Sequence, residues 1–340
     1  MQRAARRARG PARTYIFLYV LAATLAAFRP AFAEDRLTIP FAPEIGVERH
    51  YEIVRSRQRS DGQRLERILE ARSRAVLTPL SRNPDGYLYR FVITETEATA
   101  PGSTKPGLER LLSRLAALTT GVALVYQADA LGAPRRLVNT REVRQALRGM
   151  LSELQVLVRS LTQAGVISQV ERPNIEANVR NILGTLATLS DEELSRNVLK
   201  EAGLLFAAGG HDLPLGRLEP FALAPGASGT AEFAAAEGRR GITSLLEAER
   251  QAVVELRVAY DRTQIGAAVA QLVERLVESN GKNRNAASPS PGPDSFRVTE
   301  SSRYLVDLRN GQPIALHHRR TMAFGERRLV EVTRIGRIRP

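Results

Sequence analysis

Residues 296–340 alternate between apolar and polar side chains in consecutive runs, and this pattern constrains the fold more than any other part of the chain. Asn310-Gly311 separates two of the runs, and both residue types tolerate the positive φ of a tight hairpin turn. A three-residue loop with a glycine bulge gives the facing pairs Leu308–Ile314, Val306–Leu316 and Tyr304–His318. We prefer this register to a two-residue loop that pairs Asp307 with Ile314, because the latter mixes polar and apolar side chains on each face.

A second turn is predicted at Gly325-Glu326. A two-residue loop there gives the facing pairs Met322–Leu329, Arg320–Glu331 and Leu316–Ile335. The apolar members extend the face that the first hairpin forms, and each cross-strand pair is worth roughly 0.2–1 kcal/mol. The end of the chain therefore predicts a three-stranded antiparallel meander.

Two of the four histidines, His317 and His318, are adjacent and raise the question of a metal or catalytic site. Adjacent side chains on a strand point to opposite faces, so the two rings cannot readily bind one ion. His50 and His211 are distant in sequence and show no ligand spacing. We interpret His317 and His318 as ordinary strand residues, and we predict no metal-ligating, cofactor-binding or catalytic residues.

Residues 34–138 are predicted to form a first β-rich region. Its clearest strand is residues 86–97, where Tyr87, Tyr89 and Phe91 recur with a period of two. Aromatic and β-branched residues in such alternation are typical of a strand with one buried face. These three aromatic side chains therefore belong to the predicted interior.

Another strand is predicted at residues 46–59. Residues 63–77 fit a strand or a helix, and we predict a strand because turn signals flank the segment on both sides. A helix and a hairpin, at residues 108–118 and 121–139, complete the region.

Residues 139–207 are predicted to form a helical insertion. Apolar residues recur at spacings of three and four over residues 140–165, which is typical of an amphipathic helix. A second helix is predicted at 172–189. Ser190, followed three residues later by glutamate, predicts a capping box that begins a third helix, and we expect this helix to end near Gly203.

Residues 208–340 return to strands. Two strands are predicted within 239–261, followed by a helix at 265–281, a flexible loop at 282–295 and the C-terminal meander. The expected fold class is α+β, with two antiparallel β-meanders that form a curved sheet or an incomplete barrel around the inserted helical segment. We expect residues 34–340 to form one domain.

The N-terminus has the three parts of a secretory signal peptide at residues 1–33. Five arginines precede the apolar residues 14–28, and Ala31–Ala33 has the small residues of a cleavage site. A retained membrane anchor is the alternative, but the apolar run falls short of the roughly 20 residues that span a bilayer. The sequence predicts an exported protein, periplasmic in an organism with two membranes and otherwise secreted, without a stable transmembrane anchor after cleavage.

Composition excludes several classes of function. The chain has no cysteine, which rules out thiolate catalysis, cysteine-based zinc sites and disulfides. Residues 1–33 hold six arginines and no acid, so their removal lowers the formal net charge from +13 to +7. The remaining positive charge is spread along a chain with only 5% aromatic residues, which argues against nucleic-acid binding. No phosphate-binding loop, nucleophile elbow or zinc-helix motif is present.

The plan of two meanders with helices between them resembles that of the incomplete β-barrels that carry lipoproteins or lipids across the bacterial envelope. It is also similar to a group of secreted β-rich bacterial proteins of unknown function. The resemblance lies in architecture over residues 37–340 and in no diagnostic motif. It implies a curved sheet that shelters an apolar cavity plugged by helices, and its candidate lining residues are Tyr87, Tyr89, Phe91, Val306, Leu308 and Leu316. The alternative is that these side chains fill an ordinary core.

Three functional hypotheses follow. The first is non-catalytic binding of an apolar ligand or a lipidated partner, with a lipid, a lipoprotein or another envelope protein as the partner. The second is a structural or scaffolding protein of the envelope. The third is a hydrolase whose site is assembled from residues distant in sequence.

Overall fold

The computed structural model describes residues 36–62, 64–101, 108–165, 167–170, 172–221, 235–261 and 296–339. The chain divides into Met1–Arg36 and Leu37–Pro340, and the large sheet and the helices belong to the second unit. The predicted signal peptide (1–33), the predicted helix at 265–281 and the predicted loop at 282–295 lie outside the described residues.

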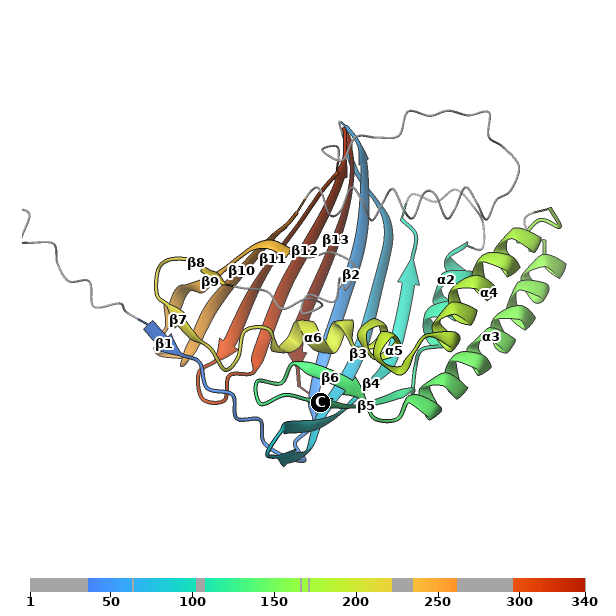
Figure 1. Cartoon of the computed structure of the whole chain (residues 1–340). Coiled ribbons are helices and arrows are strands. Elements are labelled where there is room, and N and C mark those ends of the chain that lie inside the picture. The colour runs from blue at the N-terminus through green and yellow to red at the C-terminus, as the bar shows by residue number, and fades with distance from the viewer. Residues whose placement is uncertain are drawn as a thin grey trace, which may run out of the picture. The chain divides into compact units, whose positions relative to one another are not determined.

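Within the described residues, eleven strands form one sheet in the order β6-β5-β4-β3-β2-β13-β12-β11-β10-β9-β8 (Figure 1). The first meander contains β2 (Arg49–Asp61), β3 (Leu65–Asn83), β4 (Gly86–Thr99), β5 (Ala123–Ala128) and β6 (Pro134–Leu137). The second contains β8 (Glu219–Phe221), β9 (Ala235–Leu246), β10 (Gln251–Tyr260), β11 (Phe296–Asp307), β12 (Pro313–Phe324) and β13 (Arg327–Ile338). Antiparallel pairing of β13 with β2 joins the two meanders into a single sheet. The predicted α+β class is therefore confirmed.

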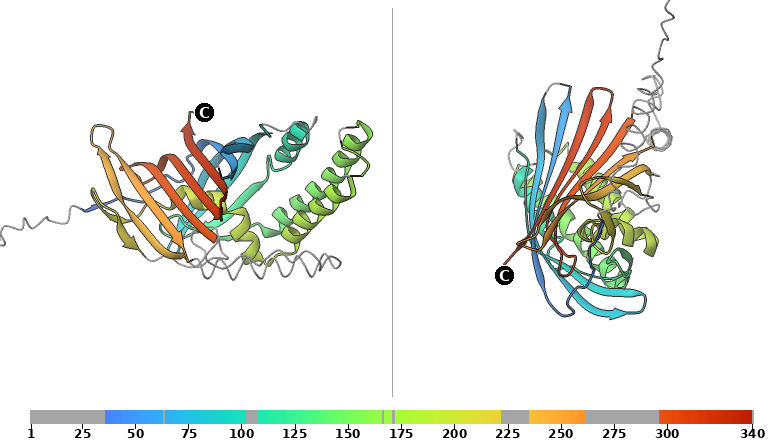
Figure 2. Two further views of the ribbon diagram at one scale, coloured as in Figure 1. Left: turned by 90° about the horizontal axis from the view of Figure 1, so that it is seen from above. Right: turned by 90° about the vertical axis from the view of Figure 1, so that its left-hand side faces the viewer.

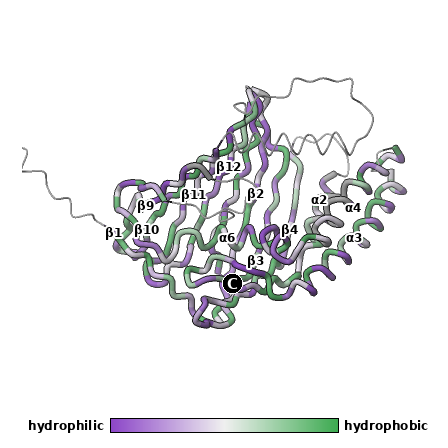
Figure 3. The backbone as a smooth tube through the Cα atoms, in the orientation of Figure 1, coloured by the Kyte–Doolittle hydropathy of each residue, from purple (hydrophilic) through white to green (hydrophobic). Residues whose placement is uncertain are grey.

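The sheet curves around helices that lie on one of its faces (Figure 2). We call this face, which carries Tyr89, Leu316 and Ile335, the covered face. The opposite face, which carries Arg90 and His317, is called the open face. Figure 3 shows the alternation between the two faces as repeated changes of hydropathy along the strands.

β3 confirms the strand interpretation of residues 63–77, although their apolar spacing also fits a helix. β3 pairs with β2 on one side and with β4 on the other. Hydrogen bonding to two neighbours and burial of one face outweigh the weak local preference of the segment for a helix.

Five described helices follow or interrupt the first meander: α2 (Leu108–Ala117), α3 (Thr140–Gln163), α4 (Arg172–Thr188), α5 (Asp191–Val198) and α6 (Lys200–Phe206). The capping box of α5 is confirmed, because Glu193 N donates to Ser190 Oγ at 3.2 Å and Ser190 N donates to Glu193 Oε2 at 2.9 Å. The prediction of one helix ending near Gly203 is wrong. The helix breaks at Leu199, whose side chain is buried in the core, and resumes as α6.

The predicted register of the first C-terminal hairpin is also wrong. Tyr304 faces Leu316, and a bulge follows before Val306 faces Pro313. The shift is two residues at Tyr304, which keeps its predicted face. It is three at Val306, where Pro313 takes the facing position and Ile314 falls in the bulge. The loop is shaped by contacts that local sequence does not reveal: Asp307 accepts hydrogen bonds from Arg309, and Gly311 packs against the backbone of Pro40. The second hairpin has the predicted pairs, including Met322 opposite Leu329.

An N-terminal segment, Ile39–Ala42, closes one end of the covered face. Ile39 N donates to His211 O at 2.9 Å, and Ala42 N donates to the carbonyl oxygen of Asn310 at 3.0 Å. The Phe41 ring lies edge-on to Tyr87 and Phe206, with centroid separations of 5.5 and 5.8 Å. Segments distant in sequence are thereby fixed at one place.

Replacing Gly311 with alanine should be strongly destabilising. Gly311 has a φ of 69°, and an added Cβ would lie 1.5 Å from Pro40 O. Gly325 is a matched control, because its φ is 55° but nothing lies within 4 Å of an added Cβ. We expect G325A to lower the free energy of unfolding by about 1 kcal/mol, the cost of the left-handed backbone, and G311A by about 3 kcal/mol or more, because a clash is added. Urea unfolding measures both, and equal losses would contradict the close approach.

Candidate functional site

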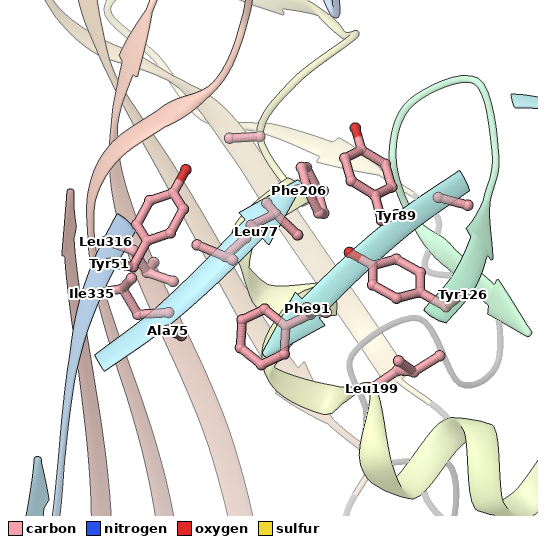
Figure 4. Close-up of a cluster of buried hydrophobic side chains, with 14 of the residues drawn as sticks. Tyr51, Ala75, Leu77, Tyr89, Phe91, Tyr126, Leu199, Phe206, Leu316 and Ile335 are labelled. Carbon is pink, nitrogen blue, oxygen red and sulfur yellow. The ribbon is translucent and has the colours of Figure 1, made fainter. Parts of the chain in front are cut away.

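The covered face holds one large apolar cluster, which we call the apolar base (Figure 4). Strands contribute among others Tyr51, Ile53, Leu77, Phe91, Tyr126 and Ile335, and the helical segment contributes Leu194, Leu199, Leu205 and Phe206. The rings of Tyr89 and Tyr126 stack at 5.5 Å, and Phe206 lies 5.1 Å from Tyr89. Phe206 of α6 therefore packs directly on an aromatic side chain of β4.

All six predicted lining residues contact this cluster. Five of them are buried in it: Tyr87, Tyr89, Phe91, Val306 and Leu316. Leu308 is partly buried at its margin. The structure thus brings the aromatic residues of β4 together with the C-terminal hairpin, which is more than 200 residues away in sequence. Whether the six side chains line a cavity stays a prediction.

Polar groups are buried inside the apolar base. Among the described residues, no hydrogen-bond partner is found for Arg49 Nε, Tyr89 OH, Tyr126 OH or Gln312 Oε1. Burial raises the pKa of the Tyr89 and Tyr126 hydroxyls, so both remain proton donors at neutral pH. Arg49 opposes that shift electrostatically at Tyr89, which places its guanidinium and the phenol in one buried environment. Sequence alternation identified Tyr89 as interior, but it identified neither Tyr126 nor the unpaired hydroxyls.

Above the apolar base, charged side chains cross four neighbouring strands of the covered face, and we call them the charge ladder. Its members in strand order are Glu300, Arg320, Glu331 and Arg57. Glu300 and Arg320 form an ion pair at 3.5 Å, and Arg57 Nε donates to Glu331 Oε1 at 3.0 Å. Burial raises the pKa of Glu300, against the opposing effects of Arg320 and a hydrogen bond from Tyr260. Only the Arg320–Glu331 pairing was predicted from sequence.

His318 lies beside the charge ladder and faces Ser302 on β11. Its Nδ1 is 2.9 Å from Ser302 Oγ, and both side chains are buried, with exposures of 9% and 4%. Burial, reinforced by Arg320, lowers the pKa of His318 to about 4, so the ring is neutral at pH 7. A neutral imidazole beside a serine is the starting arrangement for nucleophilic catalysis. Here, however, the serine is enclosed by its own sheet, which favours a structural hydrogen bond.

His317 lies on the open face, opposite Arg303 and Arg334. The adjacent histidines thus point to opposite faces, as strand geometry requires. Across the described residues, no cluster of three or more histidines and carboxylates could hold a metal ion. In the same part of the chain, every helix is too short or too polar to span a bilayer.

The free energy of unfolding should fall as the pH is lowered from 7 toward 5. In this range a histidine in the unfolded chain gains a proton, whereas His318 in the folded protein stays neutral. The pKa of His318 is about 4 in the fold against 6.5 for an ordinary histidine. The unfolded state therefore binds more protons between these values, and stability present at pH 7 is lost on acidification. The His318 share of the loss between pH 7 and pH 5 is about 2 kcal/mol.

Urea unfolding of H318Q at both pH values measures this share. We expect H318Q to lose less stability on acidification than the unmodified chain. H317Q, altered at the exposed neighbour whose pKa is lowered less, should show a smaller change in the same direction. His211, whose pKa burial also lowers to about 4, contributes equally to all three proteins. An unchanged pH dependence in H318Q would show that the buried ring is not held neutral.

Comparisons with known proteins give likenesses to solved structures alone. No family model matches the chain, and no curated protein matches it. Among solved structures, lipovitellin, reported under the description "lipid-protein interactions in lipovitellin", is similar with a TM-score of 0.41 and 10% sequence identity. The alignment covers 87% of this chain and 25% of the lipovitellin chain, so the chain spans about a quarter of the length of that protein.

Proposed function

We propose that the protein is a non-catalytic binding protein that holds an apolar ligand, or the lipid of a lipidated partner, between the covered face and helices α5 and α6. The observation that carries the proposal is a group of three among the buried polar atoms that have no partner within the described residues: Arg49 Nε, Tyr89 OH and Tyr126 OH. A buried polar group left without a hydrogen bond costs about 1–3 kcal/mol. Native interiors contain few of them, and each calls for a physical explanation.

All three atoms are hydrogen-bond donors, and their surroundings are aromatic and aliphatic. An amphiphile matches this combination, because its chain fits among apolar side chains while a carboxylate, phosphate or ester oxygen accepts the hydrogen bonds. Arg49 supports the same class of ligand. Its guanidinium is buried, and the nearest ion-pair partner is Glu44 at 3.9 Å. Burial lowers the pKa of Arg49, and an anionic or strongly accepting group beside it would stabilise its charge.

Entry of a ligand requires part of the cover to move, because the side chains of the apolar base are buried. Helix α6 is the element best suited to move. It has seven residues, and besides its apolar side chains an ion pair between Glu201 and Arg55 of β2 holds it to the sheet. We infer that α6, together with α5, opens away from β12 and β2 to admit the ligand.

The N-terminal sequence supports a location for this activity. Its signal-peptide pattern favours export, so the ligand would be met in the cell envelope or outside the cell. Lipids and lipoproteins are the apolar molecules expected there.

Conservative tyrosine variants test the ligand site. We expect Y89F and Y126F to bind a fluorescent long-chain fatty acid roughly five- to tenfold more weakly, because each loses one hydrogen bond to the head group. Both variants should also unfold at equal or higher urea concentration, because an unpaired buried hydroxyl is removed without loss of the ring. Y260F is the matched control, since this hydroxyl bonds Glu300 outside the apolar base, and it should lose stability but retain affinity.

Native mass spectrometry of the purified full chain supplies the second readout. Co-purified lipid supports the proposal. The proposal would be rejected if the protein carried no co-purified lipid and also took up no fatty acid. A stable protein partner recovered by crosslinking in cells, without lipid adducts, would instead favour the scaffolding role.

The route of entry has its own test. E201Q removes the ion pair to Arg55 and should speed fatty-acid uptake in stopped-flow measurements by up to about fivefold, the effect of a partly exposed salt bridge. E192Q is the control, because Glu192 pairs with Arg196 within α5 and faces solvent. Equal uptake rates in E201Q and E192Q would place the entry elsewhere.

A further inference from the structure

The middle of the open face carries a row of cations on the central strands of the sheet. Arg303 of β11, His317 of β12 and Arg334 of β13 lie directly opposite one another, and Arg319 lies two residues further along β12 on the same face. All four side chains are exposed. We call Arg303, Arg319 and Arg334 the arginine row.

Within the described residues, no acid forms an ion pair with the arginine row. In the described part of the chain, no carboxylate forms an ion pair with any of its three members, although the acids of the same face are paired with other arginines. These pairs are Arg257–Glu255 at 2.6 Å, Arg72–Glu52 at 3.3 Å and Arg74–Glu95 at 3.2 Å. Desolvation together with Arg334 and Arg319 lowers the pKa of His317. Positive charge is therefore in excess here, because Glu255, the one carboxylate directly opposite a member of the row, is ion-paired with Arg257, and like charges on facing strands repel.

We propose that the arginine row binds the anionic head groups of a lipid bilayer. Guanidinium groups bind phosphate through paired, charge-assisted hydrogen bonds. Arg303 and Arg334 are two strand spacings apart, about 10 Å, so they suit neighbouring head groups better than a single phosphate. The sheet curves toward its helices (Figure 2), so the middle of the open face is the part of the sheet that would first meet a flat surface.

The surroundings of the row favour a lipid surface over single-stranded nucleic acid. Proteins that bind single strands stack the bases on aromatic side chains. No facing neighbour of the row is aromatic: Ser301 and Val332 flank Arg319, Val54 faces Arg334, and Glu255, which forms its ion pair with Arg257, faces Arg303. Contact through the open face also leaves the helices of the covered face directed away from the bilayer. This proposal does not rest on the ligand site proposed above.

The proposal is tested by cosedimentation of the full chain with vesicles of anionic phosphatidylglycerol or of zwitterionic phosphatidylcholine. The test variant is R303Q/R319Q/R334Q. The control is R72Q/R74Q/R257Q, which removes the same charge from the same face but takes arginines that have carboxylate partners. All three proteins share one N-terminus, so its arginines contribute equally.

We expect the unmodified chain to bind the anionic vesicles, with affinity that falls as salt rises. The test variant should bind about 100-fold more weakly, at roughly fivefold per arginine, and the control should stay within about fivefold of the unmodified chain. Circular dichroism should show both variants folded, because exposed side chains are changed. Equal binding of the test variant and the control, or equal binding to both lipids, would overturn the proposal. Tighter binding of a single-stranded oligonucleotide, lost in the test variant, would assign the row to nucleic acid instead.

Discussion

The structure depends on covering one apolar face of a long sheet that does not close on itself. A closed barrel buries its inner face by joining its two edges, whereas here β6 and β8 lie at opposite ends of the sheet. The covered face must therefore be buried by other parts of the chain. Helices α5 and α6 and the segment Ile39–Ala42 do this with Leu205, Phe206 and Phe41. The cover is made of short pieces, and for that reason it is suited to both packing and opening.

The sequence predicted which face of the sheet a side chain occupies more accurately than it predicted hairpin register and helix breaks. Alternation assigned Tyr89, Val306 and Leu316 to the interior because the period of a strand is a local property. The hairpin at Asn310-Gly311 was misregistered by two residues at Tyr304, a shift that alternation cannot detect because an even shift keeps each side chain on its face. The bulge before Val306 adds a third residue, and periodicity gives no sign of it. The break at Leu199 also escaped prediction, since the side chain is buried in a cluster that includes residues of strands distant in sequence. Turns that need no outside contact, such as Gly325-Glu326, were placed correctly.

The candidate site likewise contains members that could be predicted from sequence and members that could not. Its apolar members could be found from sequence because each carries its own signal. The charge ladder and the Ser302–His318 contact could not, apart from the one pair within the second hairpin. Glu331 meets Arg57 only because β13 pairs with β2 in one particular register. The unpaired hydroxyls of Tyr89 and Tyr126 are even harder to predict from sequence. Whether a hydroxyl lacks a partner depends on the positions of all the polar atoms around it in the folded chain.

The position of β13 has a consequence for how the protein is made. β13 ends at Ile338, yet it occupies the sixth place among eleven strands. While synthesis proceeds from the N-terminus, β2 can pair with β3 but presents an unpaired edge until Arg327–Ile338 emerges. An unpaired edge of this length is a template for association with other chains. A chain truncated before Arg327 would therefore leave two half-sheets, each with an exposed strand edge prone to aggregation.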